Sequence, residues 1–232
     1  MTLAERSRLV SVVVPVHNGA AFVADALDSV LAQTYAPVEL IVVDDGSDDD
    51  TASIVARHGP AVAVIRQPHA GPAAARNAGV SAASGEYISF LDADDLWPVD
   101  KLAVQVPYLD CPQTADMVFG TAIQFSGDAA DHSFRLGPDA DPVVAALVPG
   151  GLLTRLETFR RVGPFSSQWR VGEFIDWFAR AQEMGLSSHV LDHLVLFRRL
   201  HDANLGRQDS AARVDFTRIL RARLERRRGE LA

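Results

Sequence analysis

The sequence predicts an α/β fold built on a mostly parallel β-sheet with helices packed on both of its faces. Short runs rich in β-branched residues alternate with stretches of helical periodicity four times between residues 9 and 91. Each apolar run ends in a polar loop, as is typical of doubly wound sheets, whose ligands bind beyond the carboxyl ends of the strands. With 232 residues, 48% of them hydrophobic, the chain is long enough to bury one sizeable core.

The first two strands are predicted from short apolar runs. Residues 9–16 form a β-branched run that leads into a turn-rich loop, residues 15–19. Residues 20–33 then repeat apolar side chains at helical spacing, which predicts an amphipathic helix. A second buried strand is predicted over residues 38–43, and it ends at the polar sequence Asp44-Asp45-Gly46-Ser47.

The next two units repeat this alternation. A helix is predicted over residues 51–58, capped by an Asp or Ser of the preceding run. A strand over residues 61–65 is followed by a loop, and an alanine-rich helix is predicted over residues 73–83. The fourth strand is predicted over Tyr87 to Leu91. We therefore expect four polar loops to converge on one crevice at the edge of the sheet.

Three carboxylates, Asp92, Asp94 and Asp95, directly follow the fourth strand. Like charges at this spacing raise one another's pKa unless a cation or hydrogen-bond donors compensate for them. A divalent ion such as Mg2+ or Mn2+ suits carboxylate oxygens and is usually completed by water and substrate phosphates. The alternative is a solvated acidic turn that caps a helix beginning near Leu96, and the residues themselves leave both interpretations open.

Composition and missing motifs exclude several classes of protein. A net charge of −8 argues against broad nucleic-acid binding, which depends on Lys and Arg. A single cysteine, Cys111, excludes an internal disulfide framework. The absence of a signal-peptide pattern and of a long apolar stretch predicts a cytoplasmic location. Neither Gly-x-Gly-x-x-Gly after the first strand nor a Walker A pattern is present, which disfavours dinucleotide and P-loop enzymes.

Four ordered motifs resemble the nucleotide-binding half of the family 2, GT-A-fold glycosyltransferases. They are Val12 to Asn18, Val42 to Ser47, Gly71 to Asn77 and Gly85 to Asp95, and the resemblance extends over residues 11–96. It implies a GT-A Rossmann-like fold and a nucleoside diphosphate sugar as donor, with a uridine diphosphate sugar favoured.

The resemblance also implies roles for individual residues. The nucleotide-binding positions would be Pro15, Val16, His17, Asp45, Gly71, Arg76, Asp92 and Ala93. The Asp-x-Asp motif of Asp92 and Asp94 would contact the ribose and bind Mn2+ or Mg2+ on the diphosphate. Two plainer alternatives remain, because Asp45 can serve as a helix cap or in an Asx-turn and Arg76 can pair at the surface with Glu86.

The second half of the chain carries a looser match. A helix is predicted over residues 101–109 and strands over residues 116–125 and 191–200, while residues 127–142 read as an acceptor-side loop. The segment Phe197 to Asn204 resembles the family's late Arg-x-x-His segment, which implies His201 as a metal ligand and Arg198 or Arg199 at the diphosphate. The alternative for His201 is a satisfied surface histidine.

Relatives with this resemblance usually place a Glu-Asp pair at the start of a late helix, with the Asp as general base. This chain has Glu173, Phe174 and Asp176 there, and phenylalanine cannot accept a proton. We expect Glu173 to be the base of an inverting reaction, with Asp176 as the second candidate because it lies one turn further into the helix. The alternative for Glu173 is a carboxylate that only stabilises the helix start through the macrodipole.

These observations predict a domain over residues 1–209, with a donor half (1–98) and an acceptor half (99–209), followed by a basic amphipathic helix over 210–232. That helix is expected to dock its apolar stripe and leave its arginines in solvent, or to contact a membrane surface or another subunit. The expected activity is inverting, metal-dependent sugar transfer to an acceptor hydroxyl on a glycan, a lipid-linked sugar, a peptide or a small molecule. The alternatives are a non-catalytic nucleotide-sugar-binding protein and a sugar nucleotidyltransferase. The latter is disfavoured because the loop at residues 15–19 lacks lysine.

Overall fold

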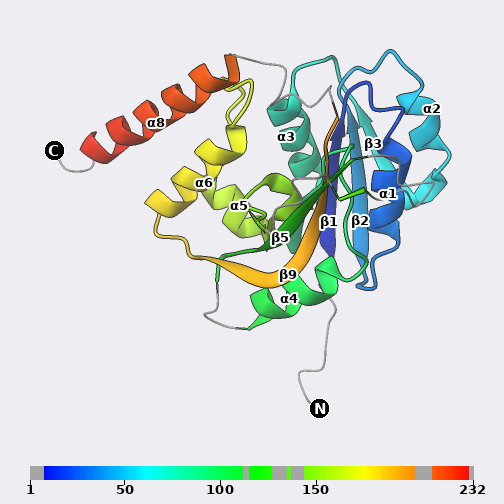
Figure 1. Ribbon diagram of the computed structural model, residues 1–232, viewed down its shortest axis with the longest axis horizontal. Coiled ribbons are helices and arrows are strands. Elements are labelled where there is room, and N and C mark those ends of the chain that lie inside the picture. Colours follow the sequence, from blue (N-terminus) through cyan, green and yellow to red (C-terminus); the bar gives the residue numbers. More distant parts are fainter. Residues whose placement is uncertain (1–7, 112–114, 127–134, 137–143, 202–210, 230–232) are drawn as a thin grey trace.

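A computed structural model describes residues 8–111, 115–126, 135–136, 144–201 and 211–229. Its centre is a nine-stranded sheet in the order β3-β2-β1-β4-β8-β5-β6, with β7 and β9 also paired to β5. Helices cover both faces of this sheet, and α8 extends from one side of the molecule (Figure 1). The predicted α/β fold with a mostly parallel core is confirmed.

The donor half forms the parallel part of the sheet. Its elements are β1 (Val10–Val16), α1 (Val23–Leu31), β2 (Val38–Asp44), α2 (Thr51–Ala56), the 3-10 helix η1 (Gly59–Ala61), β3 (Val62–Arg66), α3 (Pro72–Ala82) and β4 (Tyr87–Phe90). Strand β1 lies between β2 and β4, β3 flanks β2, and all three pairings are parallel. Their carboxyl ends therefore point to one edge of the sheet, as the alternating pattern predicted.

The acceptor half adds a mixed part to the same sheet. Its elements are α4 (Lys101–Asp110), β5 (Met117–Ser126), β6 (Arg135–Leu136), β7 (Val144–Ala145), the 3-10 helix η2 (Pro149–Gly151), β8 (Leu153–Arg155), α5 (Leu156–Val162), α6 (Glu173–Glu183), β9 (Ser188–Arg199) and α8 (Ala211–Gly229). Strand β8 joins the halves by pairing antiparallel with both β4 and β5. The long strand β9 runs parallel to β5.

Two apolar cores lie on opposite faces of the sheet. Alternation along β1 supplies both, because Val12 and Val14 belong to one core and Val13 to the other. The first core also contains Leu27 of α1, and the second contains Trp177 of α6. Figure 1 shows α1 and α2 on one side of the strands and α3, α5 and α6 on the other. Burial on both faces explains why the parallel strands are continuous apolar runs.

Element boundaries differ from the predicted ones by a few residues, with two larger differences. No helix begins at Leu96; its backbone pairs with that of Phe197 instead, and α4 begins at Lys101. Within the predicted loop 127–142, the described residues 135–136 form β6, and the rest lie outside the described residues.

The C-terminal helix α8 docks differently from the expectation. Of its predicted apolar stripe only Ile219 is buried, while Val214, Leu220 and Leu224 are about half exposed. Arg226 instead reaches two acidic residues of α6, Asp176 and Glu183. The expected solvated arginine face is therefore found only in part, since Arg218 and Arg221 are exposed whereas Arg226 is bound by the carboxylates of α6. None of the helices described by the structure is long and apolar enough to cross a membrane.

Candidate functional site

The carboxyl ends of β1 and β2 are joined by hydrogen bonds between the loops that follow them. The Asp45 N–H donates to the carbonyl of Val16 (2.8 Å), and His17 Nδ1 donates to the carbonyl of Asp45 (2.9 Å). Asn18 and Ser47 link the same two loops, with the Asn18 N–H donating to Ser47 Oγ (2.9 Å). These contacts bring the predicted nucleotide-binding positions Val16, His17 and Asp45 together.

The carboxylate of Asp45 is the centre of this cluster, and the residue is 2% exposed. Its Oδ1 accepts from Gln67 Nε2 (2.7 Å) and the Ala70 N–H (2.9 Å). Its Oδ2 accepts from the Gly71 N–H (2.8 Å) and lies 2.9 Å from His69 Nδ1. Asp45 therefore does not cap α2 but organises the loop before α3. The side chain of its neighbour Asp44 accepts from the N–H of Ser47, three residues on.

Two glycines make this cluster possible. Gly71 precedes α3 with φ = 91°, a conformation that L side chains rarely adopt, and this lets its N–H reach Asp45. Gly46 has φ = 76°, and a Cβ there would lie 2.8 Å from the backbone nitrogen of His69. The absence of a side chain at Gly46 thus allows the two loops to touch.

Arg76 connects the donor half to the acceptor half. It is 4% exposed, and its guanidinium forms ion pairs with Asp92 and with Glu173 at the start of α6. Its Nε is buried without a hydrogen-bond partner among the described residues. The alternative of a surface pair with Glu86 was wrong, because Glu86 pairs with Arg8.

In the acidic segment after β4, burial and mutual repulsion disfavour the charged form of two carboxylates. Burial and the neighbouring Asp92 raise the pKa of Asp94. Burial, followed by Asp94 and Asp92, raises the pKa of Asp95 well above its usual range. A bound cation would relieve this repulsion.

The predicted metal ligands are only partly gathered. His201 Nε2 lies 2.9 Å from Asp94 Oδ2, and the His201 ring stacks on Phe22 at 4.8 Å. Asp92 instead pairs with Arg76, and the described parts of the chain contain no group of three His, Cys, Asp or Glu side chains suited to a metal. In this arrangement the expected ligands Asp92, Asp94 and His201 are therefore not gathered around one point, and their role as metal ligands stays a prediction. The Asp94–His201 pair does fit one divalent cation whose other ligands are water and phosphate.

The two arginines at the end of β9 differ in their surroundings. Arg199 is 2% exposed, lies between the rings of Phe22 and Phe125, and pairs with Asp25 at 3.1 Å. Its guanidinium also donates to the backbone carbonyl of Asp94 (3.0 Å). Arg199 thus supports the acidic loop from inside the fold, whereas the neighbouring Arg198 is exposed to solvent.

At the start of α6, helical geometry directs Glu173, Phe174 and Asp176 to different surroundings. Phe174 is 5% exposed and packs with Phe165, Trp177 and Phe178 in the second core. Glu173 turns toward the donor half and reaches Arg76. Asp176 is 3% exposed and is held by Arg180 and Arg226. The helix therefore presents only Glu173 to the residues at the strand ends.

A family model for glycosyl transferase family 2 matches residues 11–171 of the chain. The match covers the β1, β2, α3 and β4 loops described above and most of the acceptor half. This chain belongs to glycosyltransferase family 2.

Relatives of this glycosyltransferase support the assignment. An uncharacterized glycosyltransferase of Rickettsia typhi is 32% identical over 211 residues, which cover 85% of this chain and 65% of the relative. The glycosyltransferase GlyG of Streptococcus pneumoniae is 37% identical over 135 residues, covering 55% of this chain and 43% of that protein. The chain thus spans less than two thirds of the length of these relatives.

Solved structures share the fold of this glycosyltransferase. Residues 1–349 of S. aureus TarS, in complex with UDP-GlcNAc, match 92% of this chain and 65% of that one, with a TM-score of 0.74 and 20% identity. The mannosyltransferase PcManGT of Pyrobaculum calidifontis, in complex with GDP-Man and Mn2+, matches 85% of this chain and 58% of that one, with a TM-score of 0.64 and 22% identity.

Sequence reasoning did not assign roles to several residues at this site. Gln67 and His69 bind Asp45, while Phe22 and Asp25 hold His201 and Arg199 respectively. Gln67 and His69 do lie in a loop predicted to reach the crevice, so their position was a usable signal. Phe22 and Asp25 belong to the α1 region, whose periodicity signalled only packing.

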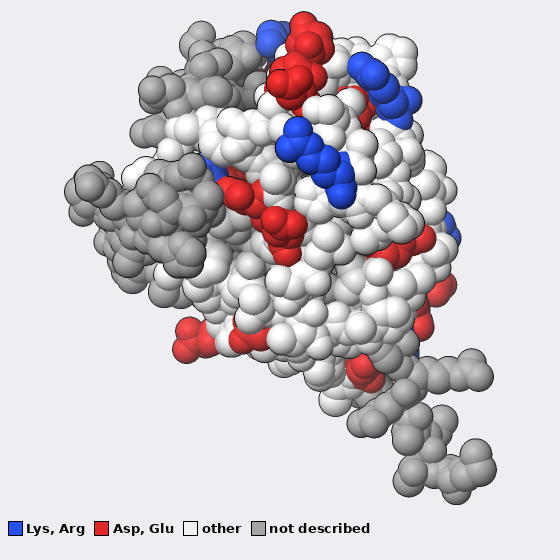
Figure 2. Space-filling model, turned by 90° about the vertical axis from the view of Figure 1, so that its right-hand side faces the viewer, with Lys and Arg blue, Asp and Glu red and all other residues white. Residues whose placement is uncertain are grey.

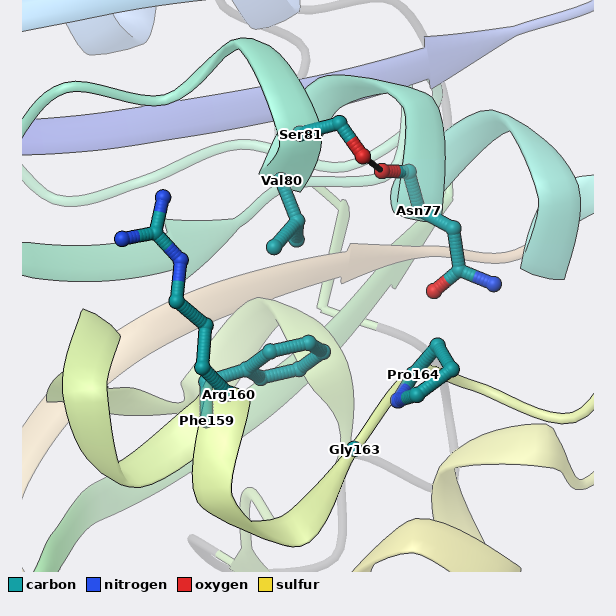
Figure 3. A pocket seen from close by; sticks show the side chains of 7 residues that line it. All are labelled: Asn77, Val80, Ser81, Phe159, Arg160, Gly163 and Pro164. Carbon is teal, nitrogen blue, oxygen red and sulfur yellow. Dashed lines mark hydrogen bonds between the residues drawn. The ribbon is translucent and has the colours of Figure 1, made fainter.

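A separate hollow of about 210 Å³ lies between α3 and α5 (Figure 3). It is lined by Asn77, Val80, Ser81, Phe159, Arg160, Gly163 and Pro164. The Asn77 amide already binds both backbone groups of Phe165, with its Nδ2 donating to the carbonyl (2.8 Å) and its Oδ1 accepting from the N–H (2.9 Å). Asn77 thus fixes the backbone at Phe165. The hollow lies away from the Asp45 cluster.

Charge on the face that carries α1 and α2 is spread out. Figure 2 shows acidic and basic side chains interspersed there, separated by uncharged surface. No continuous basic surface forms on that face, so its charge pattern does not indicate phosphate-backbone binding.

Proposed function

We propose that this chain transfers a sugar from a nucleoside diphosphate sugar to an acceptor hydroxyl with inversion at the anomeric carbon. The observation that carries the proposal is the contact between Asp94 and His201, at the same sheet edge as Asp45. The pKa values of Asp94 and of the neighbouring Asp95 are both raised. The fold neighbours crystallised with UDP-GlcNAc, and with GDP-Man and Mn2+, support a nucleotide-sugar donor.

For the donor, we propose that the base binds at Pro15, Val16, His17, Asp45 and Gly71, and that Asp92 and Ala93 contact the ribose. Asp45 supplies a buried carboxylate acceptor, which suits a base carrying a ring N–H. Arg76 holds Asp92 in place through their ion pair. This favours a uridine diphosphate sugar as the donor.

Asp94 and His201 would hold a single Mn2+ or Mg2+ ion together with the diphosphate. When bound, such an ion neutralises charge on the diphosphate leaving group. Arg198 lies close enough to the acidic loop for its charge to act on Asp95, and we propose that it contacts the leaving group as well.

Glu173 is the carboxylate that we propose as general base. As the acceptor oxygen attacks the anomeric carbon, its proton passes to Glu173, and the bond from that carbon to the β-phosphate oxygen breaks. Arg76 orients Glu173 by binding its Oε1. Asp176, held by two arginines, is the less suitable candidate.

A second candidate function is nucleotide-sugar binding without transfer. The observation that favours it is the Arg76–Glu173 ion pair, because a carboxylate already bound to a guanidinium is a less effective proton acceptor. The acceptor, the cytoplasmic location and any membrane or subunit contact of α8 remain predictions.

The proposal is tested by donor binding and turnover in one panel. A nucleoside diphosphate is expected to raise the melting temperature more with Mn2+ than in excess EDTA, because the ion links Asp94 to the diphosphate. Asp94→Asn should remove this coupling and lower transfer about a hundredfold.

Asp192→Asn, on the exposed part of β9, is the matched control and should behave like the original chain. Equal stabilisation by the nucleotide in EDTA would contradict the metal assignment. Donor binding without release of nucleoside diphosphate, across a panel of sugars and acceptors, would favour the binding protein.

A further inference from the structure

Two histidine rings are stacked over the Asp45 cluster. The rings of His17 and His69 lie 4.0 Å apart between centroids, with 26° between their planes. His17 Nδ1 donates to the backbone carbonyl of Asp45 (2.9 Å). His69 Nδ1 lies 3.2 Å from the same carbonyl and 2.9 Å from the carboxylate oxygen Oδ2.

Four nitrogen atoms lie against the Asp45 carboxylate, and they differ in their freedom to move. Two are backbone N–H groups, of Ala70 and Gly71, and one is the half-buried Gln67 amide. The fourth is His69, whose side chain is 58% exposed. The His69 backbone is seated against Gly46, so the ring can turn away while its main chain stays in place. His69 is therefore the exchangeable donor.

The His69 ring presents the chemistry of a nucleotide base. It is planar, it stacks on His17, and its Nδ1 nitrogen lies 2.9 Å from Oδ2 of the buried Asp45 carboxylate. The imide N–H of uracil has the same shape and polarity. A third ring does not fit between His17 and His69, since a stack on both sides needs about twice their present separation. A base can reach Asp45 Oδ2 only when His69 leaves it.

We propose that His69 occupies the base position in the free protein and is displaced when the donor binds. This inference rests on the proposed function, since it concerns the same base site. The cost of displacing His69 lowers the apparent affinity for the donor. After His69 has moved, Oδ2 of Asp45 can accept a ring N–H, which uracil and guanine supply. The corresponding ring nitrogen of neutral cytosine carries no hydrogen, so cytosine leaves the carboxylate without a hydrogen bond.

The experiment measures binding of UDP and CDP by calorimetry in Mn2+ to the full chain and to single variants. His69→Ala is expected to bind UDP about tenfold more tightly than the original chain, because the competing ring is gone. CDP should bind more weakly than UDP to both. His193→Ala, which alters a half-buried histidine paired with Asp100, is the matched control and should not change UDP affinity. In the original chain, UDP should also shift the ring nitrogen resonances of His69.

Failure of the His69 displacement can be distinguished from failure of donor binding. If the original chain binds UDP and His69→Ala binds it equally or more weakly, the displaced-ring inference is overturned while the donor site stands. If UDP binds without changing the His69 resonances, the inference is overturned as well. If neither protein binds any nucleoside diphosphate, the proposed function fails, and the inference fails with it.

Discussion

Two pairs of carboxylates, one pair in each half of the chain, are stabilised by different partners. On the donor side, Asp45 is surrounded by N–H groups of the loop 67–71, and Asp49 accepts from Thr51 and from the Ala20 N–H. On the acceptor side, Asp176 is bound by Arg180 and Arg226, and Glu183 by Arg226. Uncharged N–H and O–H groups thus hold Asp49, and guanidinium groups hold Asp176 and Glu183.

The difference separates two uses of acid groups. Hydrogen bonds from uncharged donors keep a carboxylate ionised and in place while leaving its charge for a ligand. At Asp49 such bonds lower the pKa even though burial acts in the opposite direction. An arginine, in contrast, neutralises the carboxylate and makes it part of the fold. Arg76 belongs to both patterns, because it begins in the donor half and binds Glu173 of the acceptor half.

The largest effect is expected when Arg76 is removed, since this breaks the link between the two patterns. Arg76→Met leaves Glu173 buried without its partner, and we expect a loss of about 3–5 kcal/mol in the free energy of unfolding. Urea denaturation measures this loss. Arg57→Met, at an exposed position on the donor side, is the control and should change stability by less than about 0.5 kcal/mol. A loss below about 1 kcal/mol for Arg76→Met would show that the ion pair behaves like a surface pair.

A second prediction sharpens the comparison within α6. Glu173→Gln should lower transfer about a hundredfold at saturating donor, because an amide cannot accept the acceptor's proton. Asp176→Asn should instead lower the free energy of unfolding by about 1–3 kcal/mol, because two arginines lose a charged partner. Transfer rates per folded molecule and denaturation curves of both variants test this split. An inactive but stable Asp176→Asn together with an active Glu173→Gln would reverse the roles.

The last prediction concerns Lys101, a buried amine that follows neither pattern. It is 0% exposed, donates to Ser89 Oγ (3.0 Å) and Gln105 Oε1 (2.8 Å), and lies over the Trp97 ring. Burial lowers the pKa of Lys101 well below its usual range. At a pH between the lysine pKa of the folded chain and that of the unfolded chain, only the unfolded chain binds the proton. The free energy of unfolding is therefore highest above the pKa of the unfolded chain and decreases as the pH falls toward the pKa of the folded chain.

Between neutral pH and about pH 10, stability of the original chain relative to Lys101→Met should therefore rise by up to about 1.4 kcal/mol per pH unit. Denaturation of both proteins across this range measures the difference. Lys101 is the only lysine of the chain, so carbon-13 labelling of lysine gives one signal that reports its titration directly. Equal slopes for the two proteins, with a lysine that titrates near the ordinary lysine pKa of 10.5, would contradict the burial argument.

Much of the fold was predictable from local pattern. The continuous apolar runs at β1, β2 and β4 predicted strands buried on both faces, and the polar sequences after them predicted loops at one sheet edge. The position of Phe174 was also predictable, since Phe174, Trp177, Phe178 and Ala181 follow the helical spacing of a core face. Reading that spacing would have placed Phe174 in the interior rather than at the reaction site.

The contacts of charged groups were less predictable, because each depends on residues distant in the sequence. Arg199 reads as a phosphate ligand from its neighbours, yet its partner is Asp25, on the first helix. The tail arginines read as solvated, yet Arg226 binds acidic residues of α6. Helical periodicity gives the face of a residue but not the charge that the facing element presents.

The sequence by itself determined the sheet, the order of its loops and the family, because each depends on residues adjacent in the chain. The tertiary structure alone decided how the carboxylates are used. Asp45 binds a backbone amide, Asp94 contacts a histidine, and Glu173 pairs with an arginine. Each of these partners is distant in the sequence and is brought near by the fold. Electrostatic energy is set by that distance in space and by burial, and neither can be read from spacing along the chain.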